Sequence, residues 1–359
     1  MTTTPLRVGL VGAGRIARMF HLPILRDLPD VRLVGVCDPD PGARRTAAEM
    51  ASGAAATADL AELLADGATD ALVICSPPSH HRGAVEAALE AGRHVYVEKP
   101  LAVTLTDAVA ARDAARARPE LVAATGFNVR FHPAVRGAFQ RLREGQLGDL
   151  VAVRGVMTSS PRELPGWKRD RATGGGALLD LASHHVDLVR HLLDEELVSV
   201  SARLRTVRTP DDTAVVQATT ASGVPVQLLV SSSSPQRDQL ELVGTSATAQ
   251  VDRMASHRVH LHRDLAPTST LDRLRTAKSV AESGLRGTAE RLRPPAEPSF
   301  AAALRAFVAA ASRQAPWRGA DLGDGLASLR VIDAAARSAA GHGQPVTLTG
   351  DPSDTASAR

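Results

Sequence analysis

A glycine turn near the start of the chain constrains the fold more than any other feature. The apolar run 6–11 leads directly into Gly12, Ala13, Gly14, Arg15, Ile16 and Ala17, and a helical pattern follows. A strand, a tight glycine turn and a helix in this order form the phosphate-binding turn of a dinucleotide fold, in which the backbone approaches a pyrophosphate and the helix N-terminus supplies donors. We therefore expect Gly12, Gly14, Arg15 and Ile16 to contact a dinucleotide, although a single GxGxxA turn is weak evidence without its surroundings.

The next apolar run, 31–37, ends in Asp38, 24 residues after Gly14. An acidic side chain at the end of the second strand accepts hydrogen bonds from the adenosine ribose and repels a 2′-phosphate, which favours NAD. NADP stays open as the alternative, because Arg44 and Arg45 follow closely and could accommodate a phosphate. Asp38 could also serve only as a turn residue.

Apolar runs and helical patterns alternate through residues 1–126, which predicts a doubly wound parallel sheet, a Rossmann domain. Ligands bind at the carboxyl ends of such strands. Two runs, 71–75 and 94–97, are followed by residues that we expect to line the cofactor cleft: Ser76, Pro77 and His81 after the first, and Glu98 after the second. His81 could instead be an ordinary polar residue at a helix start.

Lysine is rare in this chain and occurs only at Lys99, Lys168 and Lys278, whereas arginine is common. A lysine can exchange a proton when its pKa is lowered, and an arginine cannot. Lys99 follows a predicted strand end, so we expect a catalytic or substrate-positioning role for it beside the nicotinamide. The alternative is an ion pair with Glu98.

The pattern changes after residue 126. Apolar runs separated by short turns predict an α+β domain over 127–349 with a large open, predominantly antiparallel sheet. This domain would bind substrate and form a homodimer or homotetramer through the open sheet. Residues 264–298 have the spacing of an inserted amphipathic helix, with a membrane-surface or anionic-partner helix as the alternative, and 350–359 is predicted to be a disordered tail.

Three glycines, 174–176, precede a helical segment on which Asp180 and His184 lie four residues apart and share a face. A carboxylate one turn away can orient an imidazole and raise its basicity, which suits a general acid or base. An ordinary surface pair is the alternative. A metal site that also includes His185 and Asp187 is disfavoured, because His185 points about 100° away from His184 on a helix.

Composition excludes several function classes. A net charge of +3 is small for 359 residues, and 3% aromatic residues leave few stacking surfaces, so nucleic-acid binding is not expected. No 18-residue apolar run predicts a membrane span, and residues 1–5 lack a signal-peptide pattern. Cys37 and Cys75 lie in apolar runs, which predicts core thiols in a cytoplasmic protein.

The ordered set of motifs resembles the Gfo/Idh/MocA oxidoreductase family. It comprises the early GAGRIA turn, the triplet Glu98-Lys99-Pro100, the junction GFNVRFHP, the stretch 174–187 and the closing DGLASLRVIDAAARSAAGHGQPV, with 255–298 unmatched. The resemblance implies a nicotinamide cofactor and hydride transfer at a hydroxyl or keto carbon of a cyclitol or sugar. It leaves two other functions open: a non-catalytic nucleotide-binding sensor or assembly protein, and a reductase of a nucleotide-linked keto-sugar.

The same resemblance implies site residues. In relatives similar to inositol dehydrogenase, the equivalents of Lys99, Asp180 and His184 act together on the substrate hydroxyl. Ala182 replaces the glycine usual in that motif, and a tyrosine acid at the position of His184 is excluded because the chain's only tyrosine is Tyr96. Candidates for the substrate pocket wall are Asn128, Arg130, His132, Trp167 and Lys168.

Overall fold

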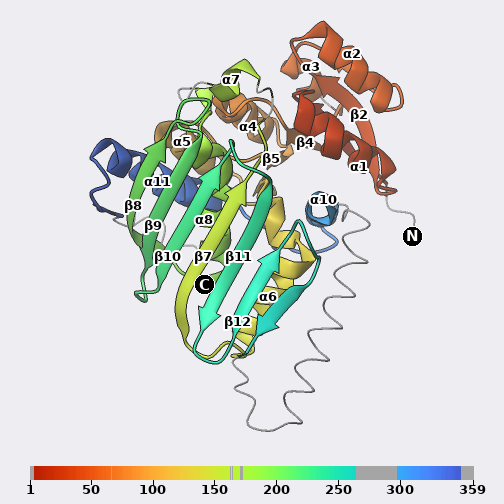
Figure 1. The fold of residues 1–359 in the computed structure, drawn as a ribbon. Helices are drawn as coiled ribbons and strands as arrows, with labels where there is room; N and C mark the ends of the chain where they lie inside the picture. Colours follow the sequence, from red (N-terminus) through yellow and green to blue (C-terminus); the bar gives the residue numbers. More distant parts are fainter. Residues whose placement is uncertain are drawn as a thin grey trace.

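Two β-sheets organise the molecule in the computed structural model (Figure 1). The structure describes residues 4–65, 67–161, 163, 165–169, 173–263 and 297–348. The predicted tail 350–359 and all but the last two residues of the predicted helix 264–298 lie outside these ranges. Within them, no helix is both long and apolar enough to cross a membrane.

The N-terminal sheet is fully parallel, as predicted. Its strands are β1 (Leu6–Val11), β2 (Val31–Cys37), β3 (Ala55–Thr57), β4 (Ala71–Ile74), β5 (His94–Val97) and β6 (Ala123–Thr125). They lie in the order β3-β2-β1-β4-β5-β6, which is the doubly wound arrangement with its switch point between β1 and β4. The sequence analysis did not predict β3, because three small residues carry no hydrophobic pattern.

Short helices connect these strands: η1 (Ala17–His21), α1 (Leu22–Asp27), α2 (Pro41–Met50), α3 (Leu60–Leu64), η2 (Pro78–His80), α4 (His81–Glu90) and α5 (Leu105–Arg116). Side-chain caps begin several of them. Asp40 accepts a hydrogen bond from the Ala43 amide at the start of α2, and Thr104 accepts one from Asp107 at the start of α5. The segment η1 is a π-turn, not a regular α-turn.

The second sheet has eight strands, β7 (Leu150–Thr158), β8 (Leu197–Arg205), β9 (Thr213–Thr220), β10 (Pro225–Ser231), β11 (Arg237–Gly244), β12 (Thr248–Asp252), β13 (Val259–His262) and β14 (Val346–Thr347). Their order is β13-β12-β11-β7-β10-β9-β8-β14. All pairs are antiparallel except β7 with β10, so the predicted predominantly antiparallel sheet is confirmed. The sequence analysis missed β13.

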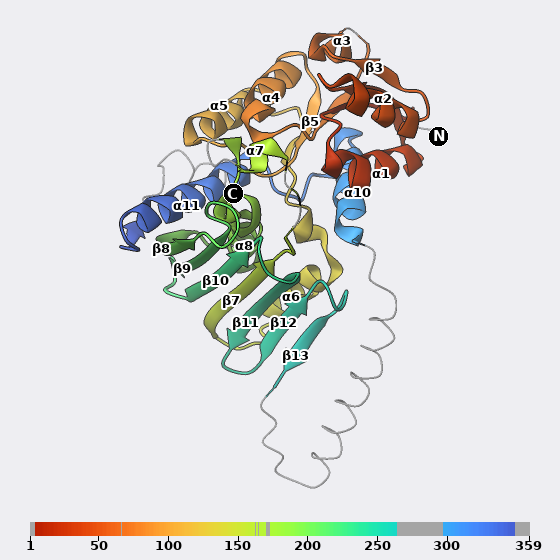
Figure 2. The same cartoon turned by 45° about the horizontal axis from the view of Figure 1, so that its top comes forward.

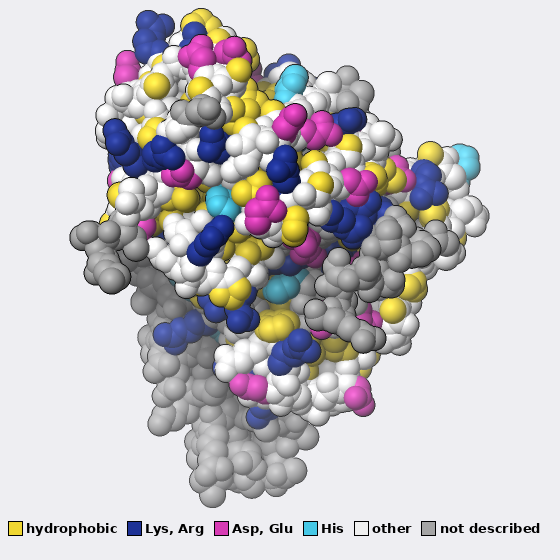
Figure 3. Space-filling model, turned by 180° about the vertical axis from the view of Figure 1, so that it is seen from behind, with side chains coloured by type: hydrophobic (Ala, Val, Ile, Leu, Met, Phe, Trp, Pro, Cys, Tyr) yellow, Lys and Arg dark blue, Asp and Glu magenta, His cyan; other side chains and the backbone are white. Residues whose placement is uncertain are grey.

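Helices cover one face of this sheet and leave the other open (Figure 1). The covering elements include α6 (Pro133–Arg143), α8 (Ser183–Leu193) and α11 (Leu322–Ala340). Figure 3 views the molecule from this helical side, where acidic and basic side chains are interspersed over the described surface. Such mixing agrees with the small net charge, and no broad surface of one sign is seen on the described part of this face.

One helix of the C-terminal half belongs to the N-terminal core. Helix α10 (Pro298–Ala311) lies beside α1 (Figure 2). Its buried Leu304 and Phe307 share a hydrophobic core with Leu22 and Tyr96. The two sheet regions are therefore joined by packing as well as by the chain connection at β6.

Candidate active site

The glycine turn has the shape of a pyrophosphate cradle. Gly12 has a φ of +88°, and a Cβ placed on it would lie 2.4 Å from the backbone nitrogen of Ser76, so only glycine fits. Gly14 faces open space, and the helix begins immediately after it with Arg15 and Ile16. The Ser76 hydroxyl is buried and has no partner among the described residues. These features fit a dinucleotide at the switch point.

Asp38 is built into the same turn. Its Oδ2 accepts a hydrogen bond from the Ala13 amide at 2.7 Å, and its Oδ1 accepts one from the Asp40 amide at 2.9 Å. Arg44 donates to the carbonyl oxygens of Asp38 and Pro39. The carboxylate therefore stands at the position expected for a ribose contact, while Arg44 is engaged by the backbone of the turn.

Two residues predicted to contact the cofactor, His81 and Glu98, form hydrogen bonds with other parts of the protein. The ring of His81 is buried, and its nitrogens lie 2.9 Å from the Ser76 carbonyl and 3.0 Å from the Pro100 carbonyl. His81 thus ties the loop after β4 to the loop after β5, and the prediction that it lines the cleft is wrong. Glu98 is also buried, where its Oε1 lies 2.7 Å from Nε2 of His21. The sequence analysis did not single out His21, although a polar residue inside the apolar segment MFHLP was a usable signal.

The centre of the candidate site is an Asp180 carboxylate held between two lysines. Lys168 Nζ lies 2.8 and 2.7 Å from its two oxygens. Lys99 Nζ lies 3.3 Å from Oδ1 and donates to the Asp180 carbonyl oxygen at 2.6 Å. The two ammonium groups hold the pKa of Asp180 well below its usual range although burial opposes them. Asp180 is therefore ionised at neutral pH.

Asp180 lies on a π-turn, η5 (Leu178–Ala182), that leads into α8. Such turns are frequent at functional sites because they displace the hydrogen-bond ladder of a helix. Here the Asp180 carbonyl oxygen accepts a hydrogen bond from the Lys99 ammonium group. The predicted helix over this stretch is confirmed, and its first turn is π instead of α.

His184 lies in the first turn of α8, and no hydrogen bond between it and Asp180 is found among the described residues. The described hydrogen bonds of the Asp180 carboxylate run to the two lysines, whereas Nδ1 of His184 is buried without a described partner. Burial and, secondly, the positive charge of Lys99 hold the pKa of His184 well below its ordinary value. The imidazole is therefore neutral at pH 7 and able to accept a proton.

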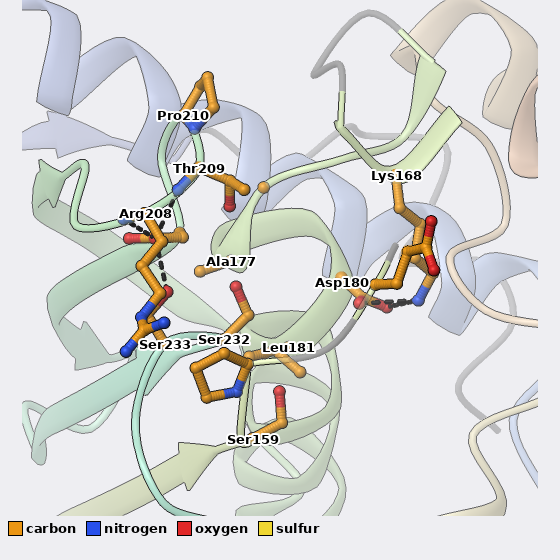
Figure 4. Close-up of a pocket in the computed structure, with 14 residues that line it drawn as sticks. Ser159, Lys168, Ala177, Asp180, Leu181, Arg208, Thr209, Pro210, Ser232 and Ser233 are labelled. Carbon is orange, nitrogen blue, oxygen red and sulfur yellow. Dashed lines mark hydrogen bonds and ion pairs between the residues drawn. The ribbon is translucent and has the colours of Figure 1, made fainter. Parts of the chain in front are cut away.

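A cavity of about 410 Å³ opens beside Lys168 and Asp180 (Figure 4). Its lining residues are Ser159, Pro161, Glu163, Lys168, Gly176, Ala177, Asp180, Leu181, Arg208, Thr209, Pro210, Asp212, Ser232 and Ser233. The loop between β8 and β9 forms one wall, and Asp212 holds it by accepting hydrogen bonds from the amides of residues 207–209 and from Ser233. This wall was not predicted from the sequence, because loop residues distant in the chain carry no shared pattern.

Three predicted pocket residues lie elsewhere. Arg130 forms a buried fork with Asp187 at 2.8 and 2.5 Å and also contacts Asp324. Asn128 donates to Ser299, and His132 caps α6 by accepting from the Ala134 amide. All three are more than nine-tenths buried and do not line the cavity, so they stabilise the fold around it.

Of the remaining candidates, Trp167 lies beside the cavity residue Lys168, whose ammonium group is 5.2 Å from the centre of its ring. His185 is not among the residues that line the cavity, and its Nε2 lies 3.3 Å from Oδ1 of Asp238. Asp187 supports the fold through its hydrogen bonds with Arg130. Because these side chains diverge from Asp180 and His184, the four do not form one metal-binding cluster.

Comparison with known proteins identifies the family. Residues 6–125 match the model described as "Oxidoreductase family, NAD-binding Rossmann fold", and residues 135–250 match the GFO/IDH/MocA C-terminal domain. The chain belongs to the Gfo/Idh/MocA oxidoreductase family. The predictions of a Rossmann domain, an NAD cofactor and an oxidoreductase are thereby confirmed.

Several Gfo/Idh/MocA relatives are similar over most of the chain. A dTDP-3,4-didehydro-2,6-dideoxy-alpha-D-glucose 3-reductase of Streptomyces antibioticus is 33% identical over 73% of this chain and 82% of its own length. An inositol 2-dehydrogenase of Rhizobium meliloti is 29% identical over 93% of this chain and 97% of its own. The crystal structure of GenD2 from gentamicin A biosynthesis in complex with NAD superposes with a TM-score of 0.81 at 27% identity, over 97% of both chains.

Proposed function

We propose that this protein oxidises a hydroxyl carbon, or reduces a keto carbon, of a cyclitol or sugar. Its catalytic residues are Lys99, Asp180 and His184. The observation that carries this is the lysine-held carboxylate beside a neutral, partly buried imidazole, at the carboxyl end of β5 and at the edge of an open cavity. The relatives named as inositol and keto-sugar oxidoreductases support the substrate class.

The residues divide the proton chemistry between them. When bound at the switch point, NAD would supply the hydride acceptor or donor. In the oxidation direction, neutral His184 takes the hydroxyl proton while the C–H bond breaks, and the Lys99 ammonium group stabilises negative charge that develops on the substrate oxygen. Asp180 is too weak a base for this step, because the two ammonium groups hold the pKa of its carboxyl well below the usual range. It instead holds Lys99 and Lys168 in place.

A second candidate, reduction of a nucleotide-linked keto-sugar, rests on the far side of the cavity. Figure 4 shows Arg208 across the cavity from Lys168 and Asp180, beside Ser233. The Arg208 guanidinium has no hydrogen-bond partner among the described residues, and arginine is well suited to phosphate. The 33% identical relative acts on a dTDP-linked keto-sugar.

The test is a spectrophotometric screen of NAD and NADP reduction over cyclitols and free sugars, and of NADH oxidation by keto-sugars with and without a nucleotide. Turnover that is lost in Lys99→Met and in His184→Gln supports the proposal. Undiminished turnover in both variants contradicts the assigned roles. Tight NADH binding without turnover of any compound favours the non-catalytic sensor.

We also propose a homodimer or homotetramer formed through the open face of the second sheet. Val215 and Leu229 are exposed, and they are paired directly across β9 and β10 on that face. Exposed apolar side chains on a sheet without covering helices suit a second copy of the chain. Light scattering of Leu229→Glu should show a smaller mass than the wild type, and an unchanged mass would exclude this face.

A further inference from the structure

The helix after the glycine turn carries a buried histidine that the proposed reaction does not use. His21 is the last residue of η1, and its Nε2 donates to Glu98 Oε1 at 2.7 Å. The other carboxylate oxygen of Glu98 accepts a hydrogen bond from the backbone nitrogen of Lys99 at 3.2 Å. Hydrogen bonds therefore run without a break from the glycine-turn helix to the backbone of the catalytic lysine.

Packing holds the His21 ring in this orientation. The ring meets Tyr96 and Phe300 edge-on, with centroids 5.9 and 5.6 Å away, and it is fully buried. Its Nδ1 has no partner among the described residues, which leaves the bond to Glu98 as its described polar contact. A buried carboxylate is costly unless it is hydrogen-bonded, so Glu98 depends on this donor.

The His21–Glu98 pair stands on the nicotinamide side of the cofactor site. A dinucleotide held at the switch point between β1 and β4 would have its adenosine half towards Asp38 at the end of β2. Its other half would then extend towards β4 and β5. Glu98 follows β5 directly, and Lys99 reaches from there to Asp180.

We propose that His21 is a positioning residue: through Glu98 it holds the strand end that carries Lys99 at a set distance from the turn that binds the pyrophosphate. Its loss leaves the adenosine half of the site intact and misplaces the nicotinamide half relative to Lys99. The part that concerns turnover rests on the proposed function, whereas the part that concerns cofactor binding does not.

The first experiment compares two ligands that differ only at the nicotinamide end. Calorimetry measures the affinities of NADH and ADP-ribose for the wild type and for His21→Leu. This substitution replaces the imidazole with an apolar side chain of similar size that cannot donate a hydrogen bond. We expect NADH binding to weaken about tenfold, as for a lost hydrogen bond to a charged group, with ADP-ribose binding unchanged. Equal losses for both ligands, or no loss for either, would overturn the proposal.

Matched variants separate positioning from general damage to the core. His21→Gln retains a side-chain amide that can donate to Glu98 and should restore most of the NADH affinity. The control is Tyr96→Phe, which changes a ring that packs against His21 but leaves the His21–Glu98 hydrogen bond in place. It removes only a hydroxyl without a partner among the described residues and should change neither affinity. If His21→Leu does not fold, Glu98→Gln tests the same link, and it should lose NADH affinity selectively.

Turnover gives the second readout, with any polyol that the wild type oxidises. In His21→Leu we expect kcat to fall while KM for the polyol is unchanged, and the primary deuterium isotope effect to rise because hydride transfer becomes slower. If the wild type oxidises no polyol, the proposed function fails, yet the comparison of NADH with ADP-ribose still decides the role of His21.

Discussion

Asp180 and Asp187 lie seven residues apart. Both form ion pairs with basic side chains, yet their roles differ. Asp180 borders a cavity, is one-fifth exposed and lies between two flexible lysines. Asp187 is a buried residue of α8 and is bound by both arms of the Arg130 guanidinium group. The cations lower the pKa of Asp180, whereas burial raises that of Asp187 despite its arginine.

The difference shows how a carboxylate can be assigned a role. Lysines that reach a cavity can transfer their hydrogen bonds to a ligand, because each ammonium group is a compact donor on a flexible stem. The buried Arg130 guanidinium group cannot transfer its hydrogen bonds to a ligand in this way. It links η3 (Asn128–Phe131), α8 and α11. We therefore expect changes around Asp180 to impair activity and changes around Asp187 to impair stability.

The largest effect is expected at Lys99. Lys99→Met removes the cation that stabilises the substrate oxygen, and kcat/KM should fall by about a thousandfold, within the range for a lost charge-stabilising or proton-transferring group. The free energy of unfolding should change little, because Asp180 keeps Lys168 as a partner for both carboxylate oxygens. Steady-state assays and urea unfolding measure the two quantities. A variant that loses stability and keeps its turnover would contradict the contrast with Asp187.

The converse change is Arg130→Met, which leaves the Asp187 carboxylate buried without its arginine. Breaking a buried pair in this way costs about 3–5 kcal/mol of stability. Turnover per folded molecule should stay within a few-fold of the wild type. The control is Arg337→Met, which breaks an exposed pair with Asp333 and should cost less than about 1 kcal/mol in the same urea experiment.

A smaller effect on activity is expected for Lys168→Met. Lys99 still contacts the Asp180 carbonyl in this variant, so the oxygen-stabilising cation remains. The carboxylate loses its bidentate partner, and we expect kcat/KM to fall about tenfold, the equivalent of about 1.4 kcal/mol. A loss as large as that of Lys99→Met would make the two lysines equivalent and would require a catalytic role for Lys168.

The smallest effect concerns pH. Protonated His184 cannot accept the hydroxyl proton, and its pKa lies well below the ordinary value of about 6.5. The kcat/KM for polyol oxidation should therefore stay level as the pH falls from 7.5 to 6.5 and should decline only in more acidic solution. A decline centred near pH 6.5 that is absent from His184→Gln would show an exposed, ordinary imidazole instead.

Local pattern was enough for the cofactor half of the molecule. A glycine turn between a strand and a helix has few solutions, and the order of strands and helices predicted the parallel sheet and the place of Asp38 at the end of its second strand. Lys99 could be singled out because lysine is rare in this chain and this one follows a strand. The apolar runs separated by short turns likewise predicted the open, predominantly antiparallel sheet.

The partners of those residues were decided by tertiary structure. Helical spacing paired Asp180 with His184, yet the π-turn and two lysines distant in the chain gave Asp180 other partners. His21 and Glu98 lie 77 residues apart and meet only because η1 packs against the end of β5. Sequence periodicity reports which face of one element a residue occupies, while a hydrogen bond between elements depends on how they pack. The stretch 174–187 was therefore recognisable as a site from the sequence alone, whereas the division of its two aspartates between chemistry and stability was not.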